Sequence, residues 1–317
     1  MTLQKHLLSD NFSYFVMDKK IAILIQRAFN ESFEPNALKS AFKKDGWDVN
    51  ILAVEDIYAS FDTDGDHFIH ITEGDIKKYD VLLVREVFLY AKYSINIITY
   101  MKNLGKVVVD NNLSVIKHTM NKIVDGQKLS QAGLPFPKTI YAPTYKGYMS
   151  LMDKIQKEIG YPLLLKHKAA GKGSSIFKMN DRLDLENKLA DLNEDKAVGR
   201  YYIQQMVDLK SDYRILVIGD KVVGAMQRIP KKGEFRANFS LGGSVKPVEL
   251  TDEMKDLAER AAKATGANFG GVDIIYTTDN KPYLLEVNRT PGFQGFMTAH
   301  GIDIPKLFVE YINNLVN

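Results

Sequence analysis

Apolar residues in the first third of the chain gather in short runs separated by polar segments. Lys20–Ile25 and Asp48–Ala53 have the Ile- and Val-rich composition of strands, and Asn36–Lys44 between them carries apolar residues at helical spacing. Tyr79–Arg85 and Lys106–Asp110 are two more strand-like runs. This order predicts a β-α-β unit with a parallel sheet. No G-x-G-x-x-G motif follows the first run, so a dinucleotide fingerprint is missing.

Two apolar runs near the end of the chain predict an antiparallel hairpin. Gly271–Tyr276 and Pro282–Asn288 are rich in Val, Ile, Leu and Tyr, and the residues between them have a turn composition. If Asp279 and Asn280 form a two-residue loop, the register of the two strands is fixed.

That register places two acidic side chains opposite each other. Asp273 faces Glu286, and Asn288 shares their face because strand side chains alternate. Opposed like charges repel, whereas a hard cation such as Mg²⁺ takes carboxylate and amide oxygens as ligands. The pattern therefore predicts a metal site; the alternative is a solvated hairpin face.

A glycine-rich segment in the middle of the chain is a candidate phosphate site. Thr119–Ala132 is predicted to be a helix, and Tyr161–Lys166 a strand that is followed by Ala169–Ser175 and a return strand, Ile176–Lys178. Such a loop offers backbone N–H groups, hydroxyls and a lysine to an oxyanion. It is not a Walker A loop, because a strand rather than a helix follows it.

The next segments carry further candidate ligands for a nucleotide. The strand Arg200–Val207 enters a polar bend that can offer backbone groups to a base, and Asp212 can accept a hydrogen bond from a ribose hydroxyl. Arg214 and Arg228 lie on the two arms of a second hairpin that turns at Gly219. Taken singly, an arginine is more often a solvated charge or an ion-pair partner than a ligand contact.

A polar segment after this hairpin is predicted to be a mobile loop. It runs from Glu234 to Gly243, and its Arg236 and Asn238 can close over phosphates.

Two other features suggest ligands less directly. Arg85 ends a strand at its carboxyl end, where α/β sheets bind ligands, so it can hold an anionic substrate or form a surface salt bridge. The segment Asp62–Glu73 resembles an EF-hand loop, but His67 stands where the turn needs glycine. A hairpin with an acidic tip is the better interpretation than a Ca²⁺ site.

Composition narrows the class of protein. A chain of 317 residues is long for one core, and its net charge of +3 does not by itself indicate nucleic acid binding. The absence of cysteine excludes disulfides and thiolate catalysis, and the six histidines lack zinc-site spacing. No segment has the length of a membrane span or the pattern of a secretory signal, which predicts a cytoplasmic protein without membrane or direct nucleic acid partners.

Taken in order, these motifs resemble the ATP-grasp carboxylate-amine ligases, and most closely their RimK-type, glutamate-ligating branch. The resemblance covers about Val81 to Asn314. It rests on Asn111-Asn112, Lys122, Ala132–Pro137, Lys166, the glycine loop, Gln204-Gln205, Ser211–Arg214, Phe235–Asn238, Gly271–Asp273, Leu285–Asn288 and Pro291–Phe293.

The resemblance implies a fold and an organisation. The fold is ATP-grasp, α/β and α+β, with an N-terminal parallel-sheet domain at 1–117 whose residues 1–18 form an accessory segment. A central subdomain follows at 118–203, and a C-terminal subdomain with the metal site at 204–317. ATP is expected between the last two.

The resemblance also implies the roles of individual residues. The cofactors are ATP and Mg²⁺ or Mn²⁺, with two ions held by Asp273, Glu286 and Asn288. ATP contacts are expected from Lys122, Lys166, Gly171, Lys172, Gly173, Ser174, Ser175, Gln204, Gln205, Met206, Val207 and Asp212. The γ-phosphate, the substrate carboxylate or an acylphosphate is expected to meet Arg214, Arg228, Arg236 and Asn238.

The implied reaction joins a carboxylate to an amine through an acylphosphate, with amino acids and peptide or protein termini as substrates. Glutamate is the leading candidate for the added amino acid. Glutathione-synthase-like and D-Ala-D-Ala-ligase-like substrates are alternatives, as is a nucleotide-binding module without ligase activity. Relatives commonly have Glu where this chain has Gln205, which bears on nucleotide preference. Relatives often form dimers or tetramers, so a homo-oligomer is compatible with the resemblance.

Overall fold

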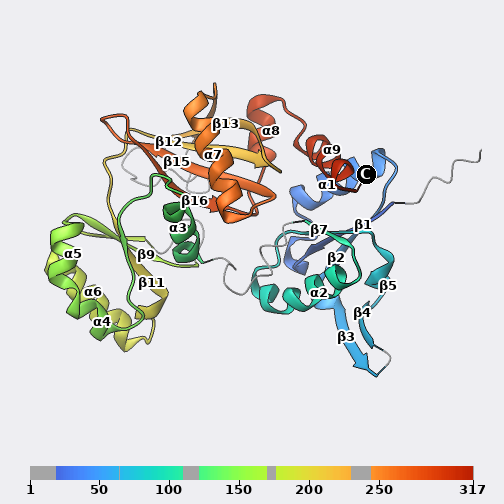
Figure 1. Cartoon of the computed structure of the whole chain (residues 1–317), viewed down its shortest axis with the longest axis horizontal. Helices are drawn as coiled ribbons and strands as arrows, with labels where there is room; N and C mark the ends of the chain where they lie inside the picture. Colours follow the sequence, from blue (N-terminus) through green and yellow to red (C-terminus); the bar gives the residue numbers. More distant parts are fainter. Residues whose placement is uncertain (1–18, 64, 110–120, 170–175, 230–243, 317) are drawn as a thin grey trace, which may run out of the picture.

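The computed structural model describes residues 19–63, 65–109, 121–169, 176–229 and 244–316. Three larger sheets follow one another along these residues, and helices cover them (Figure 1). The first sheet belongs to the N-terminal part, the second to the centre of the chain and the third to its C-terminal part.

A four-stranded parallel sheet forms the N-terminal part, in the order β2-β1-β6-β7. Its strands are β1 (Lys20–Ile25), β2 (Asp48–Ala53), β6 (Val81–Val84) and β7 (Val107–Val109). Helix α1 (Phe33–Lys44) packs on the face that carries Ile21 and Ile23, and α2 (Ala91–Asn103) on the face that carries Ala22 and Leu24. The predicted β-α-β unit is confirmed.

The acidic segment that resembles an EF-hand forms a hairpin. Strands β3 (Ile57–Asp62) and β4 (Gly65–His70) pair antiparallel, and β5 (Gly74–Asp75) adds a short third strand. The hairpin projects from the N-terminal sheet (Figure 1). The predicted hairpin is confirmed, while Asp64 lies outside the described residues.

The central sheet is antiparallel, in the order β10-β9-β11-β8. Its strands are β8 (Thr139–Ile140), β9 (Leu163–His167), β10 (Ile176–Met179) and β11 (Tyr201–Gln205). Helices α4 (Tyr145–Ser150), α5 (Met152–Glu158) and α6 (Arg182–Glu194) cover one face, where Leu163, Leu165 and Ile203 are buried. Lys166 and Gln204 therefore lie on the opposite face, because side chains alternate along a strand.

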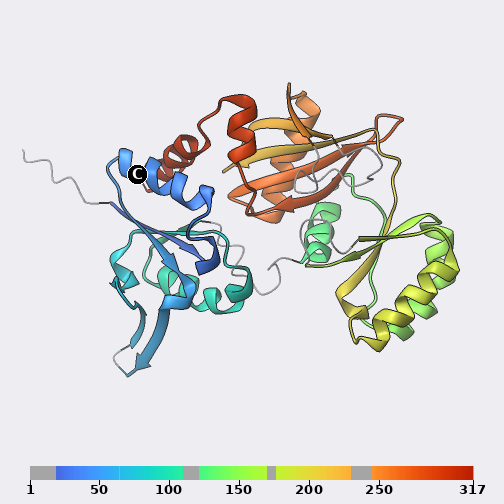
Figure 2. The ribbon, with the colours of Figure 1, turned by 180° about the vertical axis from the view of Figure 1, so that it is seen from behind.

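The C-terminal sheet has five antiparallel strands in the order β14-β13-β12-β15-β16. They are β12 (Ser211–Ile218), β13 (Lys221–Ile229), β14 (Ser244–Val248), β15 (Phe269–Tyr276) and β16 (Pro282–Asn288). Helix α7 (Asp252–Thr265) packs on one face, against residues such as Ile215 and Val272. Figure 2 shows this sheet from behind, between the N-terminal and central parts.

Helix α3 (Lys122–Gln131) packs with the C-terminal sheet, although it precedes the central sheet in the chain. Its Leu129 belongs to the same apolar core as α7, and the segment after it runs along the edge strand β16, where Leu284 N donates to Pro135 O at 2.8 Å. The expected boundaries at 117/118 and 203/204 stay a prediction.

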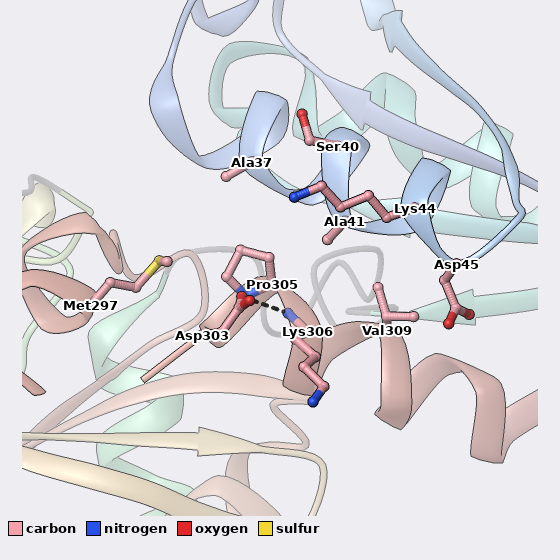
Figure 3. A pocket seen from close by; sticks show the side chains of 10 residues that line it. All are labelled: Ala37, Ser40, Ala41, Lys44, Asp45, Met297, Asp303, Pro305, Lys306 and Val309. Atoms are coloured by element: carbon pink, nitrogen blue, oxygen red, sulfur yellow. Dashed lines mark hydrogen bonds between the residues drawn. The ribbon is translucent and has the colours of Figure 1, made fainter. Parts of the chain in front are cut away.

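The last helices connect the C-terminal part to the N-terminal sheet. Helix α8 (Gln294–His300) is followed by α9 (Ile304–Val316), which packs against α1. Phe308 of α9, Ile23 of β1 and Phe269 of β15 share one core. A pocket of about 390 Å³ lies between α1 and the α8–α9 segment, lined by Lys44, Met297 and Lys306 among others (Figure 3). None of the predicted site residues lines it.

Candidate active site

The hairpin of β15 and β16 places Asp273 directly opposite Glu286, and Gly271 opposite Asn288. The predicted pairing of the two acids is therefore confirmed. Because side chains alternate between the two faces along a strand and directly paired residues share a face, Asp273, Glu286 and Asn288 all lie on one face of the sheet. Asn288 Oδ1 accepts from Thr290 N at 3.0 Å.

The predicted two-residue loop of this hairpin is wrong. Thr277 N donates to Lys281 O at 3.0 Å, which leaves three residues in the loop, and Asn280 has a φ of 60°. A left-handed residue after a tight turn is typical of three-residue hairpin loops. The register near the loop is therefore shifted by one, and an irregularity after Asp273 shifts it back so that the two acids meet.

Asp273 is 4% exposed and is neutralised by two arginines, one on the adjacent strand β12 and one on β13, the next strand beyond it. Arg214 of β12, its register partner, donates from Nε and from Nη2, the latter at 2.9 Å. Arg228 of β13 donates from Nη1 at 2.9 Å. Burial alone raises the pKa of Asp273, but the charges and hydrogen bonds of the two arginines outweigh burial and hold that pKa below its usual value.

Asp212 extends this network to the far side of Arg228. Its Oδ1 accepts from Arg228 Nε at 3.0 Å and from Nη2 at 2.5 Å. Burial raises the pKa of Asp212 despite the attraction of Arg228, and the charge of Asp273 raises it further. In the structure this carboxylate is hydrogen-bonded to Arg228. Its predicted contact with a ribose stays a prediction.

Glu286 lies beside a lysine that comes from α3. Lys122 Nζ is 2.7 Å from Glu286 Oε2, and both side chains are about 30% exposed. Asn121 begins the helix, because its side chain accepts from Ile123 N at 3.1 Å. Lys122 N also donates to Lys168 O at 3.0 Å, which connects the start of α3 with the central sheet.

Lys166 faces this group from the central sheet. Its Nζ donates to Gln204 Oε1 at 2.6 Å, and Gln204 Nε2 donates to Thr139 Oγ1 at 3.0 Å. Burial, with a contribution from the nearby charge of Lys122, lowers the pKa of Lys166 to about 8, while Glu286 opposes this shift. The structure thus brings Lys122 and Lys166 together at Glu286, as the motifs predict for two phosphate ligands.

The segment predicted to bind adenine forms the connection between the central and C-terminal sheets. Gln205 ends β11, where its N donates to Lys138 O at 2.8 Å. Met206 and Val207 follow outside any strand and are partly buried. Their backbone contact with a base stays a prediction.

Arg85 occupies a different environment from the one predicted. It is 1% exposed, its guanidinium lies 4.7 Å from the ring centroid of Phe269, and its Nη2 donates to Pro291 O at 3.4 Å. The side chain therefore joins the N-terminal sheet to the C-terminal sheet rather than standing on the surface. The surface salt bridge that was the alternative is wrong, and contact with a substrate stays a prediction.

The remaining predicted residues lie outside the described residues. They are Gly171, Lys172, Gly173, Ser174, Ser175, Arg236 and Asn238.

A buried ion pair that was not predicted from the sequence lies behind the site. Arg289, directly after β16, donates to both oxygens of Asp125 on α3, from Nη1 at 2.8 Å and from Nη2 at 2.6 Å. The pair lies one helical turn from Lys122 and three residues from Glu286. An acid within the first turn of a helix is the only sequence signal that could have suggested it.

The donor set on the hairpin face fits Mg²⁺. No group of three or more His, Cys, Asp or Glu side chains suited to a metal occurs among the described residues. The candidate set instead consists of two carboxylates and one amide oxygen, all hard ligands, from residues that the register brings to one face. Asp273, Glu286 and Asn288 would hold such an ion, which would supply positive charge to phosphate oxygens.

Comparison with known proteins identifies the family. The RimK-like ATP-grasp domain matches residues 119–312. A probable alpha-L-glutamate ligase of Thioalkalivibrio sulfidiphilus is 30% identical over 295 residues, which are 92% of this chain and 95% of that protein. The chain belongs to the RimK-like ATP-grasp family. The predicted resemblance is confirmed, and the chain is an ATP-dependent, ADP-forming ligase that joins an acid to an amino acid; ligases of this family use ATP with Mg²⁺.

Solved structures show the same fold. The ATP-grasp ligase PsnB has a TM-score of 0.69 at 18% identity, covering 95% of this chain and 100% of its own. The macrocyclase MdnC of Microcystis aeruginosa MRC has a TM-score of 0.67 at 13% identity, covering 93% and 99%. The predicted ATP-grasp fold is confirmed. No helix among the described residues has the length and apolar character needed to cross a membrane.

Proposed function

We propose that this RimK-like ligase activates the terminal carboxylate of a peptide or protein as an acylphosphate and joins it to the amine of glutamate. The observation that carries the proposal is the row of charges on one face of the C-terminal sheet. Arg214 and Arg228 lie at one side of Asp273, and Glu286 lies at the other, beside Lys122.

Each part of this row suits a part of the reaction. Two arginines can hold the γ-phosphate and the substrate carboxylate, since their planar groups bind such anions in a bidentate way. Lys122 and Lys166 can hold the other phosphates, while Asp273, Glu286 and Asn288 hold two Mg²⁺ or Mn²⁺ ions. Phosphoryl transfer then depends on positioning and charge rather than on a protein nucleophile.

Cationic side chains neutralise both acids, Arg214 and Arg228 at Asp273 and Lys122 at Glu286. A metal–nucleotide complex brings positive charge to the acids and negative charge to the cations, so the same residues exchange partners without leaving an uncompensated buried charge. This exchange supports nucleotide binding between the two sheets.

The comparisons support the choice of substrates. Relatives that cover nearly the whole chain are named probable alpha-L-glutamate ligases. PsnB is solved with a precursor peptide and AMPPNP, and also with Mg and ADP. Glutamate and a peptide are accordingly the first substrates to test.

The test is Mg²⁺-dependent ADP release from ATP with each amino acid in turn and a peptide that ends in glutamate, followed by mass spectrometry. A product heavier by one glutamate residue supports the proposal. A product whose mass increase matches another amino acid shows that this amino acid, and not glutamate, is the substrate. ATP binding without ADP release across the panel contradicts the proposal and favours a nucleotide-binding module.

A further inference from the structure

Glu86 lies at the carboxyl edge of the N-terminal parallel sheet. It lies two residues after the end of β6, and its backbone O accepts from the N–H of Gln26, directly after β1, at 2.8 Å. Ligands of open parallel sheets bind outside the carboxyl ends of the strands. Glu86 is an acidic side chain at such an edge that the proposed function does not use.

One oxygen of this carboxylate has no hydrogen-bond partner in the part of the chain that the structure describes. Glu86 is 8% exposed, and its Oε1 lies 3.4 Å from Arg85 Nη2. Its Oε2 is buried and makes no hydrogen bond to any of the described residues. Buried polar atoms normally make hydrogen bonds, and a buried carboxylate oxygen without one lowers the stability of the fold. A ligand that donates a hydrogen bond to this oxygen would remove that cost. The long contact with Arg85 engages only the other oxygen.

The position of Glu86 connects it to the proposed active site. Arg85 Nη2 also donates to Pro291 O at 3.4 Å. Pro291 follows the candidate metal ligand Asn288 by three residues, and a Cβ atom on Gly271 would lie 2.9 Å from both Pro291 Cβ and Arg214 Cδ. Arg85 therefore connects Glu86 to Pro291, and Pro291 and Arg214 both lie next to Gly271.

We propose that Glu86 binds the ammonium group of the amine substrate through Oε2. The inference rests on the proposed ligation, because it assigns the second substrate of that reaction. Arg214 and Arg228 suit anions, whereas a carboxylate with a free oxygen accepts N–H bonds from a cation. Glu86 holds the nitrogen on the N-terminal side of the site, and the activated carboxylate lies beside the arginines.

The experiment compares the wild-type ligase with Glu86→Gln, which keeps the shape but removes the charge. L-glutamate is the amine, and glutarate, which lacks the amine, is the competitive inhibitor. Loss of a charged hydrogen bond predicts a KM for L-glutamate raised by about 10- to 100-fold, with the KM for ATP unchanged. The Ki of glutarate should stay the same, because glutarate has no ammonium group to lose.

Glu73→Gln is the matched control. Glu73 pairs with Lys78 at 2.9 Å beside the β3–β5 sheet, so its loss should leave all three constants unchanged. Glu86→Asp, which keeps the charge on a shorter side chain, provides a second variant if Glu86→Gln does not fold. Its KM for L-glutamate should also rise, because the carboxylate is withdrawn from the nitrogen.

Three results would overturn the inference. An unchanged KM for L-glutamate in the folded variant rules out the contact. An equal rise in the KM of L-glutamate and the Ki of glutarate shows general damage to the site. If no amino acid stimulates ADP release by the wild-type ligase, the proposed function itself fails, and the inference falls with it. If an amino acid other than glutamate stimulates ADP release, the same comparison is made with that amino acid and its deamino analogue in place of L-glutamate and glutarate.

Discussion

Lys122 Nζ lies 2.7 Å from the carboxylate of Glu286, so the first residue of α3 neutralises an acid on the edge strand of the C-terminal sheet. The two residues are far apart in the chain, and each belongs to a different half of the proposed nucleotide site. The contact means that a proposed phosphate ligand and a proposed metal ligand interact electrostatically with each other.

Glu286→Gln should abolish most Mg²⁺-dependent turnover without unfolding the protein. Glu286 is partly exposed, so its loss leaves no deeply buried charge, and a proposed metal ligand disappears. We expect kcat/KM for ATP to fall by at least about 100-fold, comparable to the loss of one electrostatic contact in other active sites. Wild-type activity of the variant with an unchanged Mg²⁺ requirement would show that Glu286 is a solvated surface residue and not a metal ligand.

Asp273→Asn should differ from Glu286→Gln in its effect on stability. This substitution leaves Arg214 and Arg228 facing a neutral amide in a buried site, and breaking a buried ion pair typically costs about 3–5 kcal/mol. We therefore expect both lost turnover and a lower free energy of unfolding, measured by urea denaturation. Equal stability of the two variants would contradict the ion-pair network.

Nucleotide affinity should fall as pH rises above about 8, where Lys166 loses its proton. The pKa of this lysine in the folded protein lies below its usual value of 10.5. Below pH 8 the amine is charged, so the binding of phosphate is not coupled to the uptake of a proton. At higher pH, binding of phosphate must take up a proton, and Kd should rise by up to about tenfold per pH unit.

Calorimetry of ATP binding between pH 7 and 9.5, in buffers of different ionisation enthalpy, measures this proton uptake. Lys166→Arg provides the control, because arginine stays charged throughout the range. Its Kd should depend less on pH than that of the wild type. A wild-type Kd that is flat over the range, without proton uptake, would exclude the predicted titration.

The buried pair of Asp125 and Arg289 should hold α3, and with it Lys122, against β16. Asp125→Asn or Arg289→Gln each leaves a buried charge uncompensated, so each should lower the free energy of unfolding by about 3–5 kcal/mol. The double variant should lose less than the two single losses together. Additive losses in urea denaturation would show that the two side chains act independently.

Gly271→Ala should reduce activity through a steric effect on Arg214. The added methyl group would meet Arg214 Cδ and Pro291 Cβ at 2.9 Å, closer than normal contact. Because proline is rigid, we expect the arginine to move and kcat to fall by about tenfold or more, as for other misplaced groups.

Gly295→Ala is the matched control for that substitution. Gly295 lies in α8 with no atom within 4 Å of its added methyl group. Alanine in a helix should stabilise the fold slightly and leave kcat unchanged. Equal kcat values for the two variants would show that the contact at Gly271 is unimportant.

The acid pair was predictable from the sequence because it depends on local alternation and hairpin pairing. Even so, the predicted register rested on a loop of the wrong length, and the irregularity after Asp273 restored the pairing. Single-residue bulges depend on how a sheet twists and packs, which the hairpin sequence alone does not reveal.

The ion pairs were not predictable, because they join residues that only the folded chain brings together. Asp125 and Arg289 are 164 positions apart, and the sequence does not tell which of many acids and bases meet. Arg85 shows the same difficulty. Its place at the carboxyl end of a strand was predicted, but its burial against Phe269 follows from the docking of two sheets.

The packing of α9 on α1 has a consequence for protein synthesis. One face of the first sheet, with Ile21 and Ile23, shares its core with Phe308 and Ile312 of α9. A growing chain on the ribosome therefore leaves the part of this apolar surface that α1 does not cover exposed until α9 has left the exit tunnel. The core of the first sheet can therefore be completed only after residues 304–316 have been made.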